Sequence, residues 1–191
     1  LFDAPQEIDR RAAVTLEHGL EMAKRLRDLG VEAIFTASDI ADNRGLFFNP
    51  EQMERYILPY LRRWAAAVKG MGLYAILHTD GDVSACLEDL AASGLDALQA
   101  IDPVAGMEMH RVKEQVGDRL CLCGNVDCGL LVMGAPEQVY AATRDLLLAC
   151  KAGGGLVLGA SNAVQPEVPI ANYWAMIDAW QDHGQYAGTR L

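Results

Sequence analysis

Basic residues are scarce in this sequence, and their scarcity argues against one large class of partners. The chain has 16 Lys and Arg residues against 26 Asp and Glu residues, so its formal net charge is −10 at pH 7. Proteins bind nucleic acid through clusters of Lys and Arg that neutralise the phosphates. We therefore expect no nucleic-acid partner.

Long apolar runs are missing as well. No stretch approaches the roughly 20 consecutive apolar residues that a membrane-spanning helix needs. The sequence as given does not open with a charged leader followed by an apolar segment. We expect a cytoplasmic protein with no membrane partner. The first residue is Leu1 rather than Met, which suggests processing or a start partway along a longer chain.

Cysteine is infrequent, and its pattern argues against a disulfide framework. An odd number of cysteines, most of them within apolar runs, is typical of reduced thiols in a reducing compartment. The five are Cys86, Cys121, Cys123, Cys128 and Cys150. Cys121, Cys123 and Cys128 are close enough in sequence to suggest a metal site. Free cysteine is among the most buried residue types, so we favour buried thiols.

What the sequence does contain is an alternation of helices and strands. The chain has 191 residues, of which 51% are hydrophobic, and this suffices for one domain. Apolar residues spaced three to four apart predict amphipathic helices, and short apolar or β-branched runs predict buried strands. The expected strands are 31–37, 73–78, 97–101, 120–122 and 156–158. The expected helices are 7–29, 49–69 with a kink at Pro59, 83–93, 107–116, 136–152 and 170–180.

Polar residues follow nearly every expected strand. They are Ser38 and Asp39, His78 to Asp80, Asp102, Asn125 to Asp127, and Ser161 with Asn162. Alternating strands and helices predict a parallel sheet, either open and doubly wound or closed as a barrel. No GxGxxG follows a strand, which weakens the dinucleotide-binding version of the open sheet. Active sites of (β/α)₈ barrels lie at the carboxyl ends of the strands, so the polar residues favour a barrel.

Five segments carry a family resemblance. They are Asp39-Ile-Ala-Asp-Asn-Arg-Gly-Leu, Asn49-Pro-Glu with Tyr56-Ile-Leu-Pro-Tyr-Leu, Asp102-Pro-Val-Ala-Gly-Met, Gly117-Asp-Arg-Leu-Cys-Leu-Cys-Gly-Asn-Val-Asp, and Gly155-Leu-Val-Leu-Gly continuing to Gln165-Pro-Glu-Val-Pro. In order and spacing they resemble the uroporphyrinogen decarboxylase and cobalamin-dependent methyltransferase superfamily over about residues 10–180. The resemblance implies strands four to eight of a (β/α)₈ TIM barrel. Eight strands usually take about 250 residues, so we expect a partial barrel in which 1–191 is the C-terminal part of one domain.

The methyltransferase branch of this superfamily activates a thiol on zinc, held by a His-x-Cys pair and a later Cys, and exchanges a methyl group with a corrinoid. His78 matches the histidine of this motif, whereas Asp80 stands at the first cysteine. Asn162, or alternatively Ser161, stands at the second. Zinc binds thiolates more strongly than carboxylates, and both cysteines of the motif are replaced here. We therefore expect weak or no zinc binding.

The decarboxylase branch binds a tetrapyrrole with many carboxylates through N-terminal Arg residues and an Asp, in segments that this sequence does not include. Its Gly-His-Gly near the last strand has no counterpart in 160–163. Asp80-Gly81 resembles part of its Asp-Gly-His, with Asp82 in the histidine position. Because neither signature is intact, a third branch with another substrate is an open alternative.

Two residues of one strand end form the centre of the predicted site. His78 and Asp80 are two positions apart, so their side chains point to the same face. The alternative is a purely structural role, with His78 bonded to a carbonyl and Asp80 capping a helix. We expect His78, Asp80 and Asp39 to be catalytic and His78 and Asp80 to be the metal ligands. The expected substrate-binding residues are Asn43, Asn125, Asp127, Ser161 and Asn162.

These features predict an enzyme that acts on a one-carbon group or a corrinoid-linked methyl substrate. Its possible cofactors are a divalent metal and a corrinoid co-substrate. Tetrapyrrole decarboxylation and a non-catalytic corrinoid or small-ligand binding module are the alternatives. Five parallel strands leave two sheet edges unpaired. We therefore expect either a homodimer or a further N-terminal segment that completes the barrel.

Overall fold

The structure is a computed structural model that describes residues 3–186, and its centre is a parallel five-stranded sheet. The strands are β1 (Ala33–Ala37), β4 (Tyr74–Thr79), β5 (Ala97–Ala100), β6 (Cys121–Val126) and β7 (Leu156–Ala160). They lie side by side in chain order, β1-β4-β5-β6-β7, and every neighbouring pair is parallel. The predicted α/β class and all five predicted strands are confirmed.

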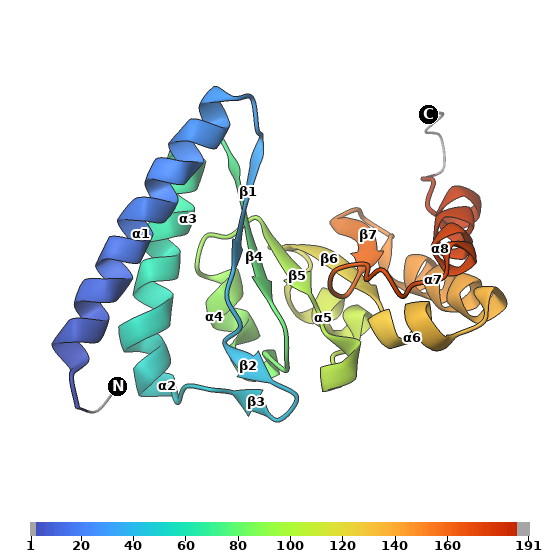
Figure 1. The fold of residues 1–191 in the computed structure, drawn as a ribbon, viewed down its shortest axis with the longest axis horizontal. Coiled ribbons are helices and arrows are strands. Elements are labelled where there is room, and N and C mark those ends of the chain that lie inside the picture. Colours follow the sequence, from blue (N-terminus) through green and yellow to red (C-terminus); the bar gives the residue numbers. More distant parts are fainter. Residues whose placement is uncertain (1–2, 187–191) are drawn as a thin grey trace.

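Helices connect successive strands and cover one face of the sheet (Figure 1). The α-helices are α1 (Pro5–Asp28), α2 (Pro50–Gln52), α3 (Leu58–Gly70), α4 (Leu87–Ala91), α5 (Met109–Val116), α6 (Cys128–Met133), α7 (Pro136–Cys150) and α8 (Ile170–His183). Helix α1 packs beside α3 at one end of the molecule, and α7 packs against α8 at the other. Among residues 3–186, no helix combines the length and apolar character that crossing a bilayer requires.

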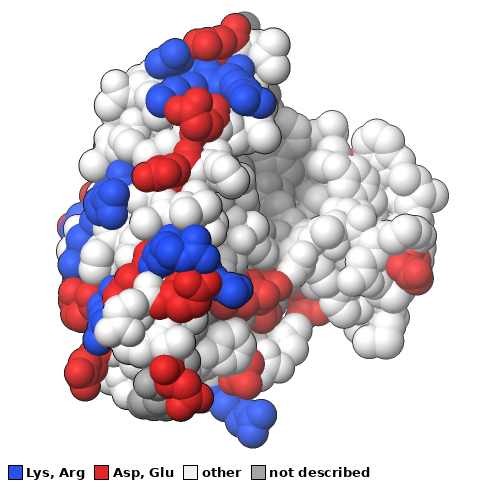
Figure 2. Space-filling view, turned by 60° about the vertical axis from the view of Figure 1, so that its left-hand side comes forward, with Lys and Arg blue, Asp and Glu red and all other residues white. Residues whose placement is uncertain are grey.

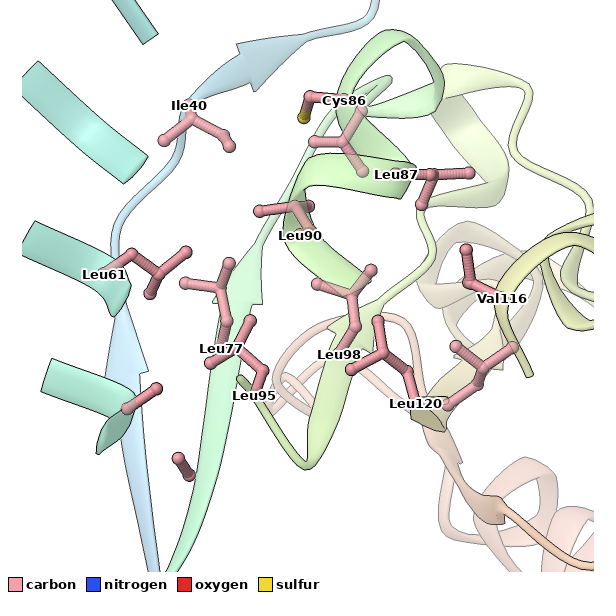
Figure 3. Close-up of a cluster of buried hydrophobic side chains, with 14 of the residues drawn as sticks. Ile40, Leu61, Leu77, Cys86, Leu87, Leu90, Leu95, Leu98, Val116 and Leu120 are labelled. Carbon is pink, nitrogen blue, oxygen red and sulfur yellow. The ribbon is translucent and has the colours of Figure 1, made fainter. Parts of the chain in front are cut away.

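The main hydrophobic core lies between this helical layer and the sheet. Leu77 on β4 and Leu98 on β5 project from the sheet and are nearly inaccessible to solvent. Leu61 from α3 and Leu90 from α4 belong to the same core cluster (Figure 3). Burying such a side chain contributes about 1.5–3 kcal/mol, so this cluster fixes the helices against the strands. The opposite face of the sheet is left for the site.

The sheet is open rather than closed. Among the described residues, β1 pairs only with β4 and β7 pairs only with β6. The face away from the helices also remains accessible, because Phe35 on β1 and Val157 on β7 expose 53% and 55% of their surface. A parallel sheet is ordinarily covered on both faces. The structure thus contains an open five-stranded α/β sheet, and the predicted partial barrel remains a proposal.

The helical segment after Asn49 shows how proline shapes the layer. Asn49 caps α2 by accepting a hydrogen bond from the Gln52 amide, as a capping box. The π-helix η1 (Met53–Ile57) follows and leads into α3, where the Leu58 amide bonds to the Met53 carbonyl. Pro59 has no N–H to donate, so it falls in the first turn of α3. The expected kink at Pro59 is therefore realised as a π-helical turn just before it.

Other elements differ from the predictions. The residues after β1 form a hairpin of two short antiparallel strands, β2 (Ala41–Asp42) and β3 (Gly45–Leu46), where no strand was predicted. The helix predicted over 83–93 is a 3₁₀-helix, η2 (Ser84–Cys86), followed by the short α4. Another 3₁₀-helix, η3 (Pro103–Ala105), follows β5, and α6 was not predicted. Strand β6 extends to Val126, beyond the predicted end at Leu122.

Candidate active site

The helix-free face of the sheet is hollowed. A cavity of about 500 Å³ is lined by residues of β1, β4, β5, β6 and β7 and by the segment after β7. At one level of the sheet, Ala37, His78, Gln99, Cys123 and Val157 are register partners on successive strands. Figure 2 shows the hollow, with most charged side chains of that view gathered on the α1 side. Within the described part of the chain, the lining residues include no Lys or Arg.

Three side chains meet at the carboxyl ends of β1 and β4. Asp39 follows β1, His78 lies near the end of β4, and Asp80 follows β4 directly. One ligand atom from each of these residues lies within 4.8 Å of those of the other two. His78 Nε2 is 3.8 Å from Asp80 Oδ1, and Asp39 Oδ1 accepts a hydrogen bond of 3.0 Å from the Asp80 amide. The structure brings together the three residues predicted to be catalytic, and their roles remain predictions.

The surroundings of Asp80 favour its neutral form. Burial raises the pKa of the Asp80 carboxyl above its ordinary value. The nearby carboxylates of Asp39 and Asp102 raise this pKa further, while His78 and a hydrogen bond from Asn162 act in the opposite direction. Several carboxylates facing one small space repel one another, so the site favours a bound proton or cation.

Two residues after β7 close the site from the far edge of the sheet. Asn162 donates a hydrogen bond from Nδ2 to Asp80 Oδ2, across 82 positions of sequence. Ser161 is buried, its amide donates to the Val126 carbonyl, and its own carbonyl accepts from Gln99 Nε2 at 3.1 Å. Gln99 Oε1 in turn contacts His78 Nδ1. These contacts join β4, β5 and the end of β7 in one network.

The other predicted binding residues are Asn125, Asp127 and Asn43. Asn125 donates to the Ile101 carbonyl at 2.7 Å and thereby links β6 to the end of β5. Asp127 caps α6 by accepting from the Leu130 amide at 2.7 Å. Asn43 lies exposed in the turn between β2 and β3 and does not line the cavity. None of the three is among the described residues that line the cavity, and their binding roles remain predictions.

The purely structural alternative matches the contacts of His78 but not those of Asp80. His78 Nδ1 contacts a carbonyl oxygen, that of the Gln99 side chain. Asp80 caps neither of the helices that follow β4, since neither η2 nor α4 has a side-chain cap. Sequence reasoning missed Gln99. Gln99 is two positions after Ala97 on a predicted strand, so the sequence indicated that both side chains point to the same face of the sheet. Nothing in the sequence indicated that Gln99 lies opposite His78 on the neighbouring strand.

The donor set suits a divalent cation held by oxygen and imidazole ligands. Carboxylates bind hard cations such as Mg²⁺ and Mn²⁺, imidazole binds intermediate ones, and thiolates select zinc. Within the described part of the chain, Asp39, His78 and Asp80 are the one group of His, Cys, Asp and Glu residues with this spacing. The residues therefore fit a metal such as Mn²⁺ and not the thiolate site of the His-x-Cys motif.

The cysteines form no comparable group within residues 3–186. All five thiols are free; Cys86, Cys123 and Cys150 are buried, and Cys121 and Cys128 are half-buried. The contact with Cys123 lowers the pKa of Cys121 to about 7 despite partial burial. The same contact, together with burial, raises the pKa of Cys123. Cys123 therefore lines the cavity as a neutral thiol.

Comparisons with known proteins bear on the family and the fold. A family model for uroporphyrinogen decarboxylase (URO-D) matches residues 1–183. The structure is that of an α/β protein with an open parallel sheet and polar residues at the carboxyl ends of its strands. Because the family model covers most of its length, this chain belongs to the uroporphyrinogen decarboxylase (URO-D) family.

Similar proteins of this family carry out different reactions. A uroporphyrinogen decarboxylase from Coxiella burnetii is 30% identical over 145 residues, which cover 74% of this chain and 39% of that protein. Methylcobamide:CoM methyltransferase MtaA from Methanosarcina barkeri is 24% identical over 183 residues, 96% of this chain and 49% of that protein. Both relatives are named as enzymes, and the specific reaction differs between them. The chain spans about two fifths to one half of their lengths.

A solved structure shares the fold. A methyltransferase from Methanosarcina mazei superposes with a TM-score of 0.74 at 23% identity, covering 89% of this chain and 48% of that one. At this identity the likeness bears on the fold alone. It agrees with an α/β arrangement that makes up about half of a larger structure.

Proposed function

We propose that this chain supplies the C-terminal βα units of a (β/α)₈ barrel enzyme that transfers a methyl group between a corrinoid and a small acceptor. The observation that carries the proposal is the meeting of Asp39, His78 and Asp80 at the carboxyl ends of β1 and β4, beside the hollow that His78 lines. Barrel enzymes place their reactive groups at this end of the strands. The likeness to a methylcobamide:CoM methyltransferase supports the same reaction class.

Asp39, His78 and Asp80 would hold a divalent cation, with one ligand atom from each residue. When bound, such a cation lowers the pKa of an acceptor's thiol or hydroxyl and so makes it a nucleophile near neutral pH. The network fixes the ligands before binding: the Asp80 amide donates to Asp39, and Asn162 donates to Asp80. Preorganised ligands need little rearrangement when the cation binds.

Substrate binding would use the uncharged part of the hollow. Phe35, Ile76 and Val157 line it with apolar surface, and its volume of about 500 Å³ suits a small acceptor. The raised pKa of Asp80 belongs to the cation-free chain; a bound cation would take the place of that proton, so the proton of the acceptor would leave to water. Asn162 donates to Oδ2 of Asp80 and so orients this carboxyl.

Tetrapyrrole decarboxylation is the second candidate, because a uroporphyrinogen decarboxylase is 30% identical to part of the chain. A substrate with many carboxylates needs cationic partners. The described residues that line the hollow include no Lys or Arg, and the carboxylates of Asp39 and Asp102 lie close enough to Asp80, next to His78 of the lining, to raise its pKa. This charge disfavours a polyanion at this site and favours the methyltransferase proposal.

The test combines metal binding with turnover. Purified chain, in the assembly that it forms, is titrated with Mn²⁺ and with Zn²⁺ and then mixed with methylcobalamin and a small thiol, while the corrinoid absorbance is followed. We expect Mn²⁺-dependent demethylation that His78→Ala abolishes and the exposed-site control His110→Ala leaves unchanged. We expect no zinc to survive dialysis. Turnover of a porphyrinogen without metal would support the decarboxylase, and no turnover with either substrate would support a binding module.

A further inference from the structure

Gln99 lies directly opposite His78 on the neighbouring strand. The two residues are register partners on β5 and β4, so their side chains share the hollowed face. Gln99 Oε1 contacts His78 Nδ1. Gln99 Nε2 donates to the Ser161 carbonyl at 3.1 Å and lies 3.5 Å from the Ala160 carbonyl. Gln99 thus spans from β4 to the end of β7.

The chemistry of these partners sets the orientation of the Gln99 amide. Backbone carbonyls only accept hydrogen bonds, so the amide group facing Ala160 and Ser161 must be the NH₂ donor. The opposite orientation would place Oε1 against two carbonyl oxygens. With the NH₂ group held there, Oε1 is left facing His78 Nδ1, and an oxygen in that position can only accept.

We propose that Gln99 is a positioning residue that holds neutral His78 in the Nδ1–H tautomer. In a neutral imidazole one nitrogen carries the proton and the other carries a lone pair. Because Nδ1 must donate to Gln99, the lone pair lies on Nε2. Nε2 is the nitrogen that faces Asp80, 3.8 Å from Oδ1. The remaining carboxylate oxygens of the cluster are also acceptors.

In this tautomer, Nε2 of His78 and the carboxylate oxygens of Asp39 and Asp80 can all donate electron pairs to a cation, and these atoms lie close to one another. In the other tautomer Nε2 would carry the proton, and this nitrogen would have no lone pair for a cation. With Nδ1 bonded to Gln99, Nε2 and Asp80 attract a cation between them. Partners that orient a ligating histidine in this way typically change metal affinity 10- to 100-fold. The consequence for metal rests on the proposed function, whereas the tautomer itself does not.

The tautomer is measured directly on metal-free protein. Long-range ¹H–¹⁵N correlation spectra of the ¹⁵N-labelled chain, recorded with a chelator and at a pH where histidine is neutral, distinguish Nδ1–H from Nε2–H rings. The chain has four histidines, and the signal lost in His78→Ala assigns His78. We expect an Nδ1–H pattern for His78, and a shift toward Nε2–H in Gln99→Met.

Two further variants separate positioning from simple folding. Gln99→Glu keeps an acceptor for Nδ1 and should retain the Nδ1–H tautomer, even if it loses the bond to Ser161. Gln115→Met, at an exposed glutamine of α5, should leave the His78 signal unchanged. A His78 ring that is Nε2–H in the wild type, or that keeps the same tautomer in Gln99→Met, would overturn the proposal.

Mn²⁺ titration then tests the consequence for metal. We expect Gln99→Met to weaken Mn²⁺ binding by about tenfold or more and Gln99→Glu to weaken it less. If the wild-type chain binds no Mn²⁺ although His78 is Nδ1–H, the proposed function fails and the tautomer assignment stands. Equal Mn²⁺ affinity of wild type and Gln99→Met would overturn the link between Gln99 and the metal.

Discussion

His78 Nε2 lies 3.8 Å from Asp80 Oδ1, on the hollowed face of the sheet, and both side chains are largely shielded from solvent. A second pair has similar geometry: His110 Nε2 lies 3.5 Å from Glu108 Oε2 at the start of α5. That pair is exposed, with 51% and 49% of its side-chain surface accessible, against 17% and 31% for His78 and Asp80. Screening by water weakens exposed pairs. The difference in burial therefore distinguishes a site from an ordinary surface contact.

The first prediction uses the two histidines as a matched pair. His78→Ala should lower the affinity for Mn²⁺ at least about tenfold, because it removes a ligand from the cluster. His110→Ala should leave that affinity unchanged. Isothermal titration calorimetry on both variants and the wild type makes the comparison. Equal loss in the two variants would mean that Mn²⁺ binds elsewhere or non-specifically.

A second prediction follows from the raised pKa of Asp80. The folded chain holds this proton more tightly than the unfolded chain does, so ionisation of Asp80 destabilises the fold as pH rises from the ordinary aspartate pKa, about 4, toward the folded value. In chelator at pH 7, Asp80→Asn should therefore melt at a higher temperature than the wild type.

The pH dependence provides the control for Asp80. The difference between the wild type and Asp80→Asn should shrink below about pH 4, where Asp80 is protonated in both the folded and the unfolded chain. Added Mn²⁺ should raise the melting temperature of the wild type and not that of the variant, because binding to the folded state stabilises it. A variant that melts lower than the wild type at pH 7 in chelator would show that Asp80 contributes more through its contacts than it costs by burial.

The sequence predicted more of the fold than of the site. Periodicity is local, so the strand at Tyr74–Thr79 and the helix at Met109–Val116 followed from neighbouring residues. The pairing of Asn162 with Asp80 spans 82 positions and depends on sheet order, which periodicity does not encode. The N-cap role of Asp127 could have been predicted from neighbouring residues, because an aspartate preceding an apolar run is typical of a helix N-cap. The six-residue α6 was too short for its periodicity to indicate a helix.

A third prediction concerns two buried threonines. Thr79 Oγ1 accepts from the Ile40 amide at 3.1 Å and so ties the segment after β1 to the end of β4. Thr79→Val would leave that amide without a partner, and we expect a loss of about 1–3 kcal/mol in the free energy of unfolding. Thr143 Oγ1 is buried with no partner among the described residues. Thr143→Val should therefore be neutral or stabilising. Urea denaturation measures both, and similar losses would contradict the argument.

A fourth prediction concerns the turn after Asp80. Gly81 has φ of +88°, and a Cβ there would lie 2.6 Å from the Ala41 carbonyl carbon and 2.7 Å from its oxygen. Gly106 has a similar φ of +80° with open space around it. Gly106→Ala should cost about 1–2 kcal/mol through its backbone alone. Gly81→Ala should cost clearly more and also weaken Mn²⁺ binding, because it pushes the β2–β3 hairpin away from Asp80. Equal cost in the two variants would show that the close approach at Gly81 relaxes freely.

The last prediction is that the open sheet is covered in the assembled protein, and it is a proposal about assembly. Strands β1 and β7 each have one side without a strand partner among residues 3–186. Phe35 and Val157 expose more than half of their surface on the hollowed face. Unpaired edges and an uncovered parallel sheet promote association. We propose that a second copy of the chain, or a further segment of the same barrel, covers this face.

An obligate contact of this kind should bury roughly 2,000 Å² or more and be largely apolar. Size-exclusion chromatography with light scattering should therefore give a mass above the 20.7 kDa of one chain, or an aggregated product when no partner is present. Val157 and Met22 have nearly equal exposure, 55% and 54%, on β7 and on the outer helix α1. Val157→Glu should break the assembly because it places a charge in the covered face, and Met22→Glu should leave it intact. A folded, well-behaved monomer of the wild-type chain would contradict the proposal, since it would show that this sheet tolerates two free edges and an exposed apolar face in water.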